Sequence, residues 1–189
     1  MSIHFYPVNS YEIHCDDYRV KINGIESATD TARVSAFPIN RRWPGHQRDK
    51  SQTELINFVR MQADEPLDIE VLTKSPFETV NIRPLGSAAN VETADGKIRF
   101  RLEKPGFYTV EPYGRHRALH LFIDPVKDYE IDRYAENVIY YGPGIHEAGS
   151  IELKSGQVLF LDEGALVYGG VRALDAENIK ILGRGFKGH

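Results

Sequence analysis

The residue types best suited to binding chemistry lie in one basic loop around the single tryptophan of the chain. Trp43 follows Arg42 directly and precedes His46 by three positions, in a stretch that also contains proline and glycine. An indole ring can stack on a sugar ring while neighbouring cations bond hydroxyl or carboxylate groups. The simpler alternative is a tryptophan that folds over a domain surface, surrounded by arginine ion pairs. That alternative is commoner for a lone tryptophan, and Arg42, Trp43 and His46 are the candidate carbohydrate-binding residues.

A glycine pattern near residue 185 invites a second chemistry, the binding of a dinucleotide. Residues 183–188 read G-x-G-x-x-G and follow the apolar run Ile179–Leu182, which is the dinucleotide fingerprint. That site also needs a helix opening at the third glycine and an acidic residue about 20 positions further on, and neither follows here. The same glycines fit the corners of a solenoid, where the backbone turns with positive φ. We therefore expect no nucleotide cofactor.

Two histidines have the spacing of zinc ligands. His116 and His120 are four residues apart, which places two ligands on one face of a helix. The alternating residues around them predict a strand instead, where such positions lie about 13 Å apart. His146 is followed by Glu147 but lacks the second histidine of an H-E-x-x-H site. We expect no metal site.

Adjacent acids at Asp162 and Glu163 could be imagined as the paired carboxylates of glycoside cleavage. Neighbouring residues of an extended chain point to opposite faces, and the pair stands immediately before Gly164. A solvated turn is therefore the better interpretation.

Charge and composition exclude several classes of function. Lys and Arg total 23 against 27 Asp and Glu in 189 residues, so the net charge is −4. With no basic stripe we expect no nucleic-acid binding. No window approaches the roughly 18 apolar residues of a membrane span, and the start lacks the features of a signal peptide. The chain is expected to be cytoplasmic as it stands, or secreted or periplasmic if a leader peptide has been removed.

The single cysteine, Cys15, rules out an internal disulfide and a thiolate zinc cluster. A reactive thiol would need partner residues that the sequence does not identify. A structural role is therefore expected.

Residues 1–125 are expected to form an antiparallel β-sandwich. Short runs with a period of two recur between turn signals, and Asp95-Gly96 predicts a hairpin. Residues 52–63 lean weakly towards helix and are interpreted as strand or irregular structure. The predicted strands are Tyr18–Ile22, Leu67–Val71, Val80–Arg83, Lys97–Leu102, Phe107–Val110 and Ala118–Phe122. Short strands separated by turns in this way favour a sandwich.

After a polar linker at 126–136 the chain becomes repetitive. The runs that begin at Asn137, Gln157 and Asn178 each place four strand-forming residues after an amide. Aligning Val138, Val158 and Ile179 gives steps of 20 and 21 residues. A repeat of this length leaves no room for a crossover helix, so βαβ units are excluded. We expect residues 137–189 to form the first coils of a right-handed parallel β-helix, cut off at its last coil.

Three segments of this repeat are similar to a known group of enzymes. Residues 137–146, 149–169 and 178–185 resemble the first β-helix coils of polygalacturonase-like and dextranase-like glycoside hydrolases. Several such enzymes carry an N-terminal β-sandwich, and the run 118–125 resembles its last strand. The resemblance implies a polysaccharide substrate and carboxylates that serve as general acid and as base or nucleophile.

The catalytic motifs of those enzymes, acidic clusters with Gly-His-Gly and Arg-Ile-Lys, belong to later coils. Asp16-Asp17 lies in the sandwich region, and Gly45-His46-Gln47 does not match. We therefore expect no catalytic residue in this chain.

The expected function is the N-terminal region of a polysaccharide-degrading glycoside hydrolase, with carbohydrate as partner. One alternative is a non-catalytic sandwich that binds carbohydrate or another chain. Another is a β-helix lyase, epimerase or transferase, since one fold carries several chemistries. An uncapped last coil would also favour self-association.

Overall fold

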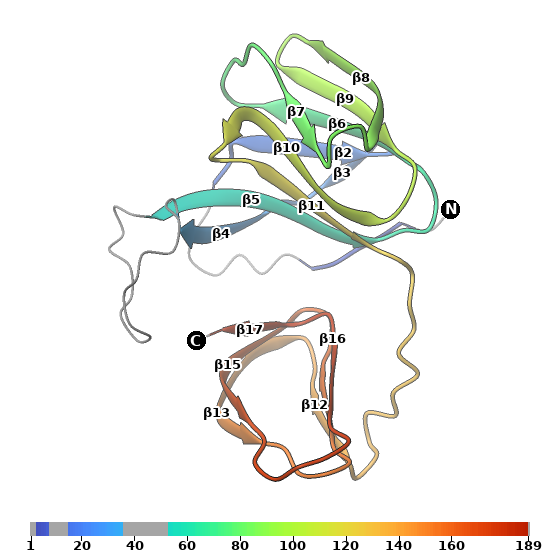
Figure 1. The fold of residues 1–189 in the computed structure, drawn as a ribbon, viewed down its shortest axis with the longest axis vertical. Coiled ribbons are helices and arrows are strands. Elements are labelled where there is room, and N and C mark those ends of the chain that lie inside the picture. Colours follow the sequence, from blue (N-terminus) through green and yellow to red (C-terminus); the bar gives the residue numbers. More distant parts are fainter. Residues whose placement is uncertain (1–2, 8–14, 36–52, 189) are drawn as a thin grey trace. The chain divides into compact units, whose positions relative to one another are not determined.

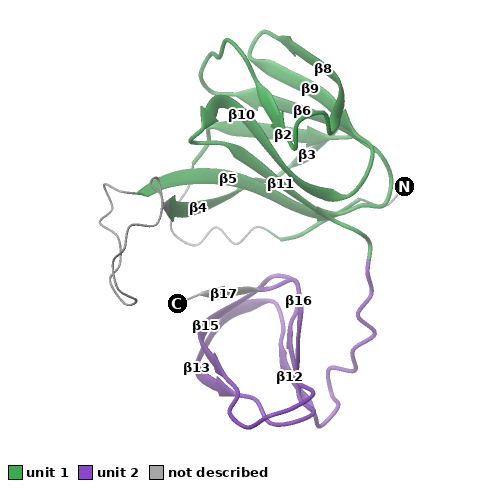
Figure 2. Cartoon of the chain, in the orientation of Figure 1, with its two compact units in different colours: residues 1–126 green, residues 127–189 purple. Residues whose placement is uncertain are grey.

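The computed structural model describes residues 3–7, 15–35 and 53–188 (Figure 1). The chain divides into two compact units, Met1–Val126 and Lys127–His189 (Figure 2). None of the described residues forms a helix that is long and apolar enough to cross a membrane. The fold is all-β, as the sequence predicts.

One sheet of the first unit has six strands. Its path runs β1 (His4–Phe5), β5 (Thr53–Gln62), β11 (Leu119–Asp124), β10 (Gly106–Arg115) and β7 (Asn81–Arg83), and β4 (Asp30–Ser35) also pairs with β5. The β5–β11 pair is parallel, whereas the other pairs described in this sheet are antiparallel. Within the stretch 52–63, left open between strand and irregular structure, Thr53–Gln62 forms a ten-residue strand.

The second sheet of this unit has five antiparallel strands. Its order is β3 (Ile25–Ser27), β2 (Tyr18–Ile22), β6 (Leu67–Thr73), β9 (Lys97–Leu102) and β8 (Ala88–Ala94). Asp95 and Gly96 connect β8 to β9 with positive φ angles of 51° and 73°, which confirms the predicted hairpin. The hairpin places β8 at the edge of the sheet.

The core of the first unit lies between the two sheets. Alternate residues of β2, β6 and β9 are buried, and so are those of β11. Ile22, Ile69 and Leu102 meet Met61 and Leu121 in one hydrophobic cluster. Each fully buried aliphatic side chain contributes about 1.5–3 kcal/mol relative to exposure. Side chains alternate between the two faces along each strand, so when one face is buried in the core the charged residues of the same strands point outward.

The second unit consists of parallel coils. One sheet stacks β12 (Val138–Tyr141), β14 (Val158–Leu161) and β16 (Lys180–Gly183), and the other stacks β13 (Gly144–Glu152), β15 (Ala165–Arg172) and β17 (Phe186–Gly188). All four pairs are parallel, which confirms a parallel β-helix. Each coil supplies one strand to each sheet.

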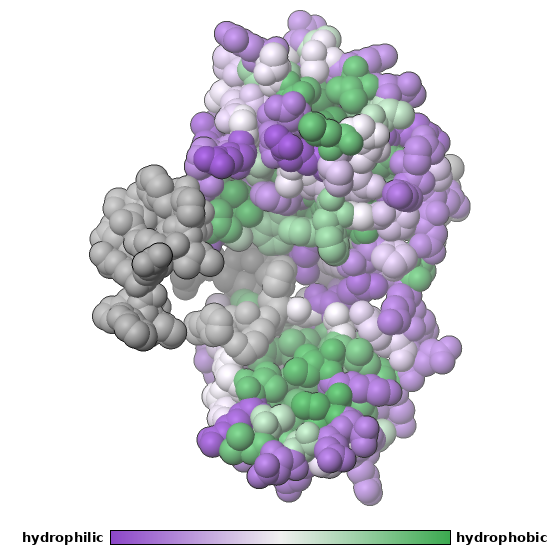
Figure 3. All heavy atoms as spheres, in the orientation of Figure 1, coloured by the Kyte–Doolittle hydropathy of each residue, from purple (hydrophilic) through white to green (hydrophobic). Residues whose placement is uncertain are grey.

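Hydrophobic side chains fill the inside of the coils. Ile151, Leu159 and Val167 are buried there, with Ile139 and Ile179 packed against them. In Figure 3 the hydrophobic residues of this unit gather in the middle of the ring of coils, with polar residues around them. Ile139 and Leu159 are paired in register, so these positions of successive coils form part of an apolar ladder.

The polar segment before the first coil lies against the outside of β12 and β14. The Tyr129 ring meets the Phe160 ring edge-on with centroids 5.6 Å apart. Phe160 in turn stacks on Tyr140 at 6.0 Å and 8°. The Arg184 guanidinium lies 5.6 Å from the centre of the Tyr129 ring. This segment is assigned to the second unit.

The predicted register is right for the first step of the repeat and wrong for the second. Val138 pairs with Val158 as expected, but Val158 pairs with Lys180 rather than with Ile179. The longer connection before β16 contains Asp175 and Asn178 at positive φ, 50° and 55°, and it takes up one extra residue. Gly183 consequently pairs with Leu161 as the last residue of β16, and its φ of 118° turns the chain there, as the sequence predicts for its glycines.

Candidate functional site

The loop residues singled out from the sequence, Arg42, Trp43 and His46, lie outside the described residues. The candidate site described below therefore comes from the part of the chain that the structure describes. It lies on the outer face of the five-stranded sheet.

One row of charged residues crosses all five strands of this sheet. The pairing register aligns Glu26 of β3 with Lys21 of β2, Lys21 with Glu70 of β6, Glu70 with Arg99 of β9, and Arg99 with Glu92 of β8. The sign of the charge alternates at each step. We call these five residues the charged row. Opposite charges directly across an antiparallel pair are favourable by about 0.2–1 kcal/mol.

The centre of the charged row is a closed ion pair. Nη2 of Arg99 lies 2.7 Å from Oε2 of Glu70, and Nε of Arg99 donates to the same oxygen at 2.8 Å. The hydrogen bond from Arg99 is the main reason why the pKa of Glu70 lies below its ordinary value; burial opposes it, and the positive charges of Arg99, Lys97 and Lys21 add to it. The pair is therefore ionised and held in one orientation at neutral pH.

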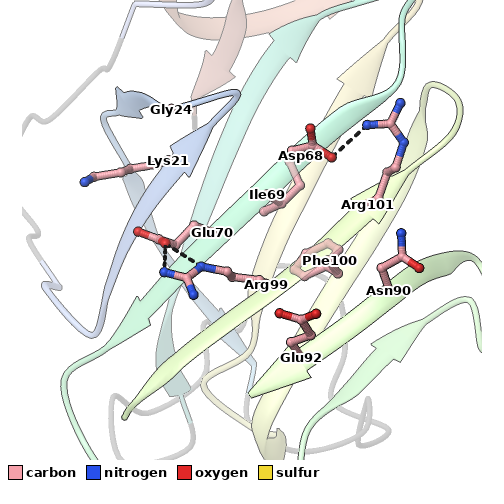
Figure 4. Close-up of a pocket in the computed structure, with 10 residues that line it drawn as sticks. All are labelled: Lys21, Gly24, Asp68, Ile69, Glu70, Asn90, Glu92, Arg99, Phe100 and Arg101. Atoms are coloured by element: carbon pink, nitrogen blue, oxygen red, sulfur yellow. Dashed lines mark hydrogen bonds and ion pairs between the residues drawn. The ribbon is translucent and has the colours of Figure 1, made fainter. Parts of the chain in front are cut away.

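A second ion pair lies two residues along the same strands. Nη1 of Arg101 is 2.7 Å from Oδ1 of Asp68, and Nε of Arg101 also donates to Glu103 at 3.0 Å. The backbone N–H of Asp68 donates to Oδ1 of Asn23 at 2.7 Å, which ties the start of β6 to the β2–β3 turn. The two pairs form the floor shown in Figure 4.

A hollow of about 490 Å³ lies over these pairs. Lys21 and Gly24 stand on the β2–β3 side, and Asn90 and Glu92 stand on β8 (Figure 4). The β8–β9 register shifts between Ala89 and Glu92, and Asn90 between them has a φ of 52°, so the bulge reshapes the β8 wall. Among the described residues, Lys21 and Glu92 form no direct ion pair.

The polar groups that line this hollow are hydrogen-bond donors and acceptors. Its lining carries an ammonium, two guanidinium groups, three carboxylates and an amide, which together offer planar donors and acceptors. The only aromatic residue in the lining, Phe100, is 3% exposed and belongs to the core. Two of the three carboxylates, Asp68 and Glu70, are held by arginines. The site is suited to holding a ligand with many hydroxyl groups.

The histidines with zinc spacing lie in different elements. His120 is in β11, but His116 lies in the β10–β11 turn, not in the strand that the sequence predicts. Gly114 near the end of β10 and Arg117 in the turn both have positive φ, so the alternating strand ends before His116. Nδ1 of His116 lies 3.1 Å from Oε2 of Glu54, whereas the His120 ring stacks on Phe122 at 6.2 Å and 12°. The two imidazoles therefore do not share a ligand.

Burial lowers the pKa of His120, with the negative charge of Glu111 acting in the opposite direction. The carboxylate of Glu111 is itself held by Arg83, whose Nε donates to both oxygens at 3.0 and 2.9 Å. No group of three or more His, Cys, Asp or Glu within the described ranges is placed to hold a metal ion.

The adjacent acids Asp162 and Glu163 lie at a corner of a coil in the second unit. Asp162 accepts a hydrogen bond from the Tyr140 hydroxyl of the preceding coil, and its Oδ1 accepts from the backbone N–H of Glu163 at 2.8 Å. This contact raises the pKa of Tyr140. Nε2 of His146 lies 2.7 Å from the carbonyl oxygen of Gly142. Asp162 and Glu163 lie in the β14–β15 turn, as the sequence predicts.

Cys15 is a half-buried free thiol next to β4. Burial raises its pKa, the largest opposing effect being a backbone hydrogen bond from Asp17. Its backbone N–H donates to Oγ1 of Thr31 at 3.0 Å, and its carbonyl accepts from Nδ2 of Asn57 at 2.5 Å. A raised pKa disfavours the nucleophilic thiolate.

The charged row was missed from the sequence, although part of its signal is visible there. The polar positions of Arg19-Val20-Lys21, Asp68-Ile69-Glu70 and Arg99-Phe100-Arg101 alternate with apolar ones. To predict which charges lie opposite one another, the order and register of the strands must be known, and the pattern within a single strand does not contain this information.

No protein-family model and no curated protein sequence matches this chain. Among solved structures it is similar to Dex49A from Penicillium minioluteum, with a TM-score of 0.60 and 15% sequence identity. The match covers 92% of this chain and 51% of Dex49A, so the chain spans about half the length of that protein. At this identity the likeness concerns the fold.

Proposed function

We propose that the chain is the N-terminal region of a glycoside hydrolase that cleaves O-glycosidic bonds of a polysaccharide. The observation that carries the proposal is the likeness to the dextranase Dex49A over 92% of the chain, which takes in both the sandwich and the coils. The resemblance of residues 137–185 to the first coils of polygalacturonase-like and dextranase-like hydrolases supports it independently of the coordinates.

The coil geometry is suited to this reaction. Glycoside hydrolysis uses two carboxylic groups, about 5–5.5 Å apart in retaining enzymes and about 6.5–9.5 Å apart in inverting ones. Parallel strands place equivalent residues of neighbouring coils about 4.8 Å apart. Acids on successive coils can thus take up the required separations. Asp162, whose carboxylate is bonded to Tyr140 and to the backbone of Glu163, is held in a corner instead.

We assign the catalytic acids to further coils of a longer polypeptide. We assign no catalytic acid to this chain. The test compares the 189-residue chain with the longest polypeptide that its gene encodes, by release of reducing ends from dextran, pectin, starch and cellulose. Turnover by the longer polypeptide alone is the expected result. Turnover by the 189-residue chain would contradict the assignment, and inactivity of a longer polypeptide that contains further coils would overturn the proposed function.

The hollow on the sandwich favours a second candidate function, a non-catalytic module that binds carbohydrate. Its polar lining and ordered ion pairs provide groups that can bind such a ligand. This candidate expects carbohydrate binding by the 189-residue chain and no hydrolysis by any longer product of the gene. Lyase, epimerase or transferase activity of the longer product on the same polysaccharides would instead indicate another chemistry on the β-helix.

A further inference from the structure

We infer that the hollow over the charged row binds an uncharged oligosaccharide laid across the strands of the five-stranded sheet. This inference rests on the carbohydrate ligand of the proposed function and adds where on the sandwich it binds, in which direction and with what charge.

The charge balance of the lining favours an uncharged ligand. Lys21, Arg99 and Arg101 face Asp68, Glu70 and Glu92, three cations against three anions. Four of these six groups form two ion pairs, each closed at 2.7 Å. A charged sugar would have to compete with these pairs, since its carboxylates would seek the guanidinium groups that Glu70 and Asp68 already hold. Hydroxyl groups can bond to the remaining donor and acceptor positions without breaking either pair.

The direction of the ligand follows from the arrangement of the polar groups. β2, β6, β9 and β8 are consecutive in the sheet, and three intervals of about 4.8 Å make a path of about 14 Å. Along it the register aligns Lys21, Glu70, Arg99 and Glu92. Residues along one strand alternate between the two faces of the sheet. On the outer face, polar groups therefore lie closer together from strand to strand than along any one strand. A short sugar chain lying across them meets a new polar group at every strand.

The two ends of this path provide the groups that select the ligand. Lys21 on β2 offers an ammonium donor, and Glu92 on β8 offers carboxylate acceptors next to the amide of Asn90 (Figure 4). Neither Lys21 nor Glu92 is held in a direct ion pair among the described residues, unlike the two pairs between them. The floor is thus fixed, and its ends are available to hydroxyl groups.

The direct test is an NMR titration of the 189-residue chain, following backbone amides. The uncharged probes are maltotetraose, isomaltotetraose and cellotetraose, and tetragalacturonate is the charged probe. We expect at least one uncharged probe to shift amides of β2, β6, β8 and β9 and to bind more tightly than tetragalacturonate. Binding by no probe, tighter binding of tetragalacturonate, or shifts confined to other strands would overturn the inference.

Two variants at the ends of the path test the contacts themselves. Lys21→Gln and Glu92→Gln should each weaken binding by about three- to tenfold, the effect of losing one hydrogen bond. Glu78→Gln is the control, because Glu78 is an exposed acid of the same unit that does not line the hollow. This variant should bind the probe as tightly as the unmodified chain does. If the three variants bind alike, the proposed contacts are wrong.

The outcomes separate this inference from the proposed function. If a longer product of the gene hydrolyses a polysaccharide while the sandwich binds none of the probes, only the inference fails. If an uncharged probe binds at the charged row while no longer product turns over any polysaccharide, the inference stands and the proposed function fails.

Discussion

Gly183 lies directly against the carbonyl group of Leu161 in the neighbouring coil. That oxygen accepts hydrogen bonds from the backbone N–H groups of Arg184 and Gly185, at 2.9 and 3.0 Å. A Cβ atom on Gly183 would overlap the same oxygen, and the φ angle of Gly183 is 118°. The coil can therefore turn after β16 only if this position has no side chain.

Gly183→Ala should destabilise the second unit. Strain at a backbone conformation of this kind costs about 1–3 kcal/mol, and the overlap with Leu161 adds to it. Urea unfolding followed by circular dichroism measures the loss. Gly170→Ala is the matched control, because a Cβ there meets nothing within 4 Å, and it should change the stability by less than about 0.5 kcal/mol. Equal effects of the two substitutions would show that the close approach at Gly183 is not real.

Arg60 and Asp30 form a buried ion pair on the six-stranded sheet. Their side chains are 9% and 6% exposed, with Nη2 of Arg60 3.2 Å from Oδ2 of Asp30. Arg60→Met leaves the carboxylate without this partner and should cost about 3–5 kcal/mol. The double variant Arg60→Met/Asp30→Leu should lose less than the single one, since it removes both charges. A double variant less stable than Arg60→Met would contradict this explanation.

The exposed pair of Lys74 and Asp16 provides the comparison. It is shorter, at 2.6 Å, but its side chains are 56% and 65% exposed. Solvent screens such pairs and ordering them costs side-chain entropy. Lys74→Met should therefore leave the denaturant midpoint unchanged within error, whereas Arg60→Met shifts it clearly.

His120 should make the first unit less stable in mild acid. Burial lowers its pKa in the folded protein, so the unfolded chain takes up a proton first as the pH falls. The stability that the neutral, buried imidazole contributes to the folded protein is fully present above the ordinary histidine pKa of about 6.5. It is lost as the pH falls through the lower pKa of the folded state. Denaturant midpoints at pH 7.5 and 5.5 should differ less for His120→Gln than for the unmodified chain. A difference of the same size in both proteins would rule out His120 as the cause.

The charged row should contribute little to stability. Arg99 is 52% exposed and Glu70 27% exposed in their side chains, so solvent and salt weaken their attraction. Arg99→Gln should cost less than about 1 kcal/mol in low salt and still less in 0.5 M NaCl, measured by urea unfolding. A loss above 2 kcal/mol that persists in salt would indicate that the row exists to hold the sheet together.

Strands with a regular apolar period could be predicted closely from the sequence. Tyr18–Ile22 and Lys97–Leu102 have the predicted bounds, because each buries alternate residues. β8 was expected only as the first strand of the Asp95-Gly96 hairpin, without bounds, since its Ala88–Ala94 sequence is mostly exposed and lacks a buried face. β3 and β4 were missed, the first having only three residues. Pattern reasoning finds strands through burial, and edge strands have little of it.

The candidate site was beyond the reach of the sequence for a different reason. Lys21, Glu70 and Arg99 are far apart along the chain, and antiparallel register makes them neighbours. Outward-facing charges are normal on a wet sheet face, so nothing in one strand marks them as a row. The extra residue before Lys180 was missed similarly, since aligning the runs that follow Gln157 and Asn178 gave a step one residue too short.

The parallel pairing of β5 with β11 has a consequence for the order in which the protein is made. β11 lies between β5 and β10 and is the last strand of the first unit to leave the ribosome. The six-stranded sheet is incomplete until Leu119–Asp124 has been synthesised. Pairing this strand with β5 closes the long stretch of chain between them, and closing a long loop is slow. Each later coil pairs mainly with the coil made just before it. The sandwich therefore closes in one late step, whereas the β-helix can grow coil by coil during translation.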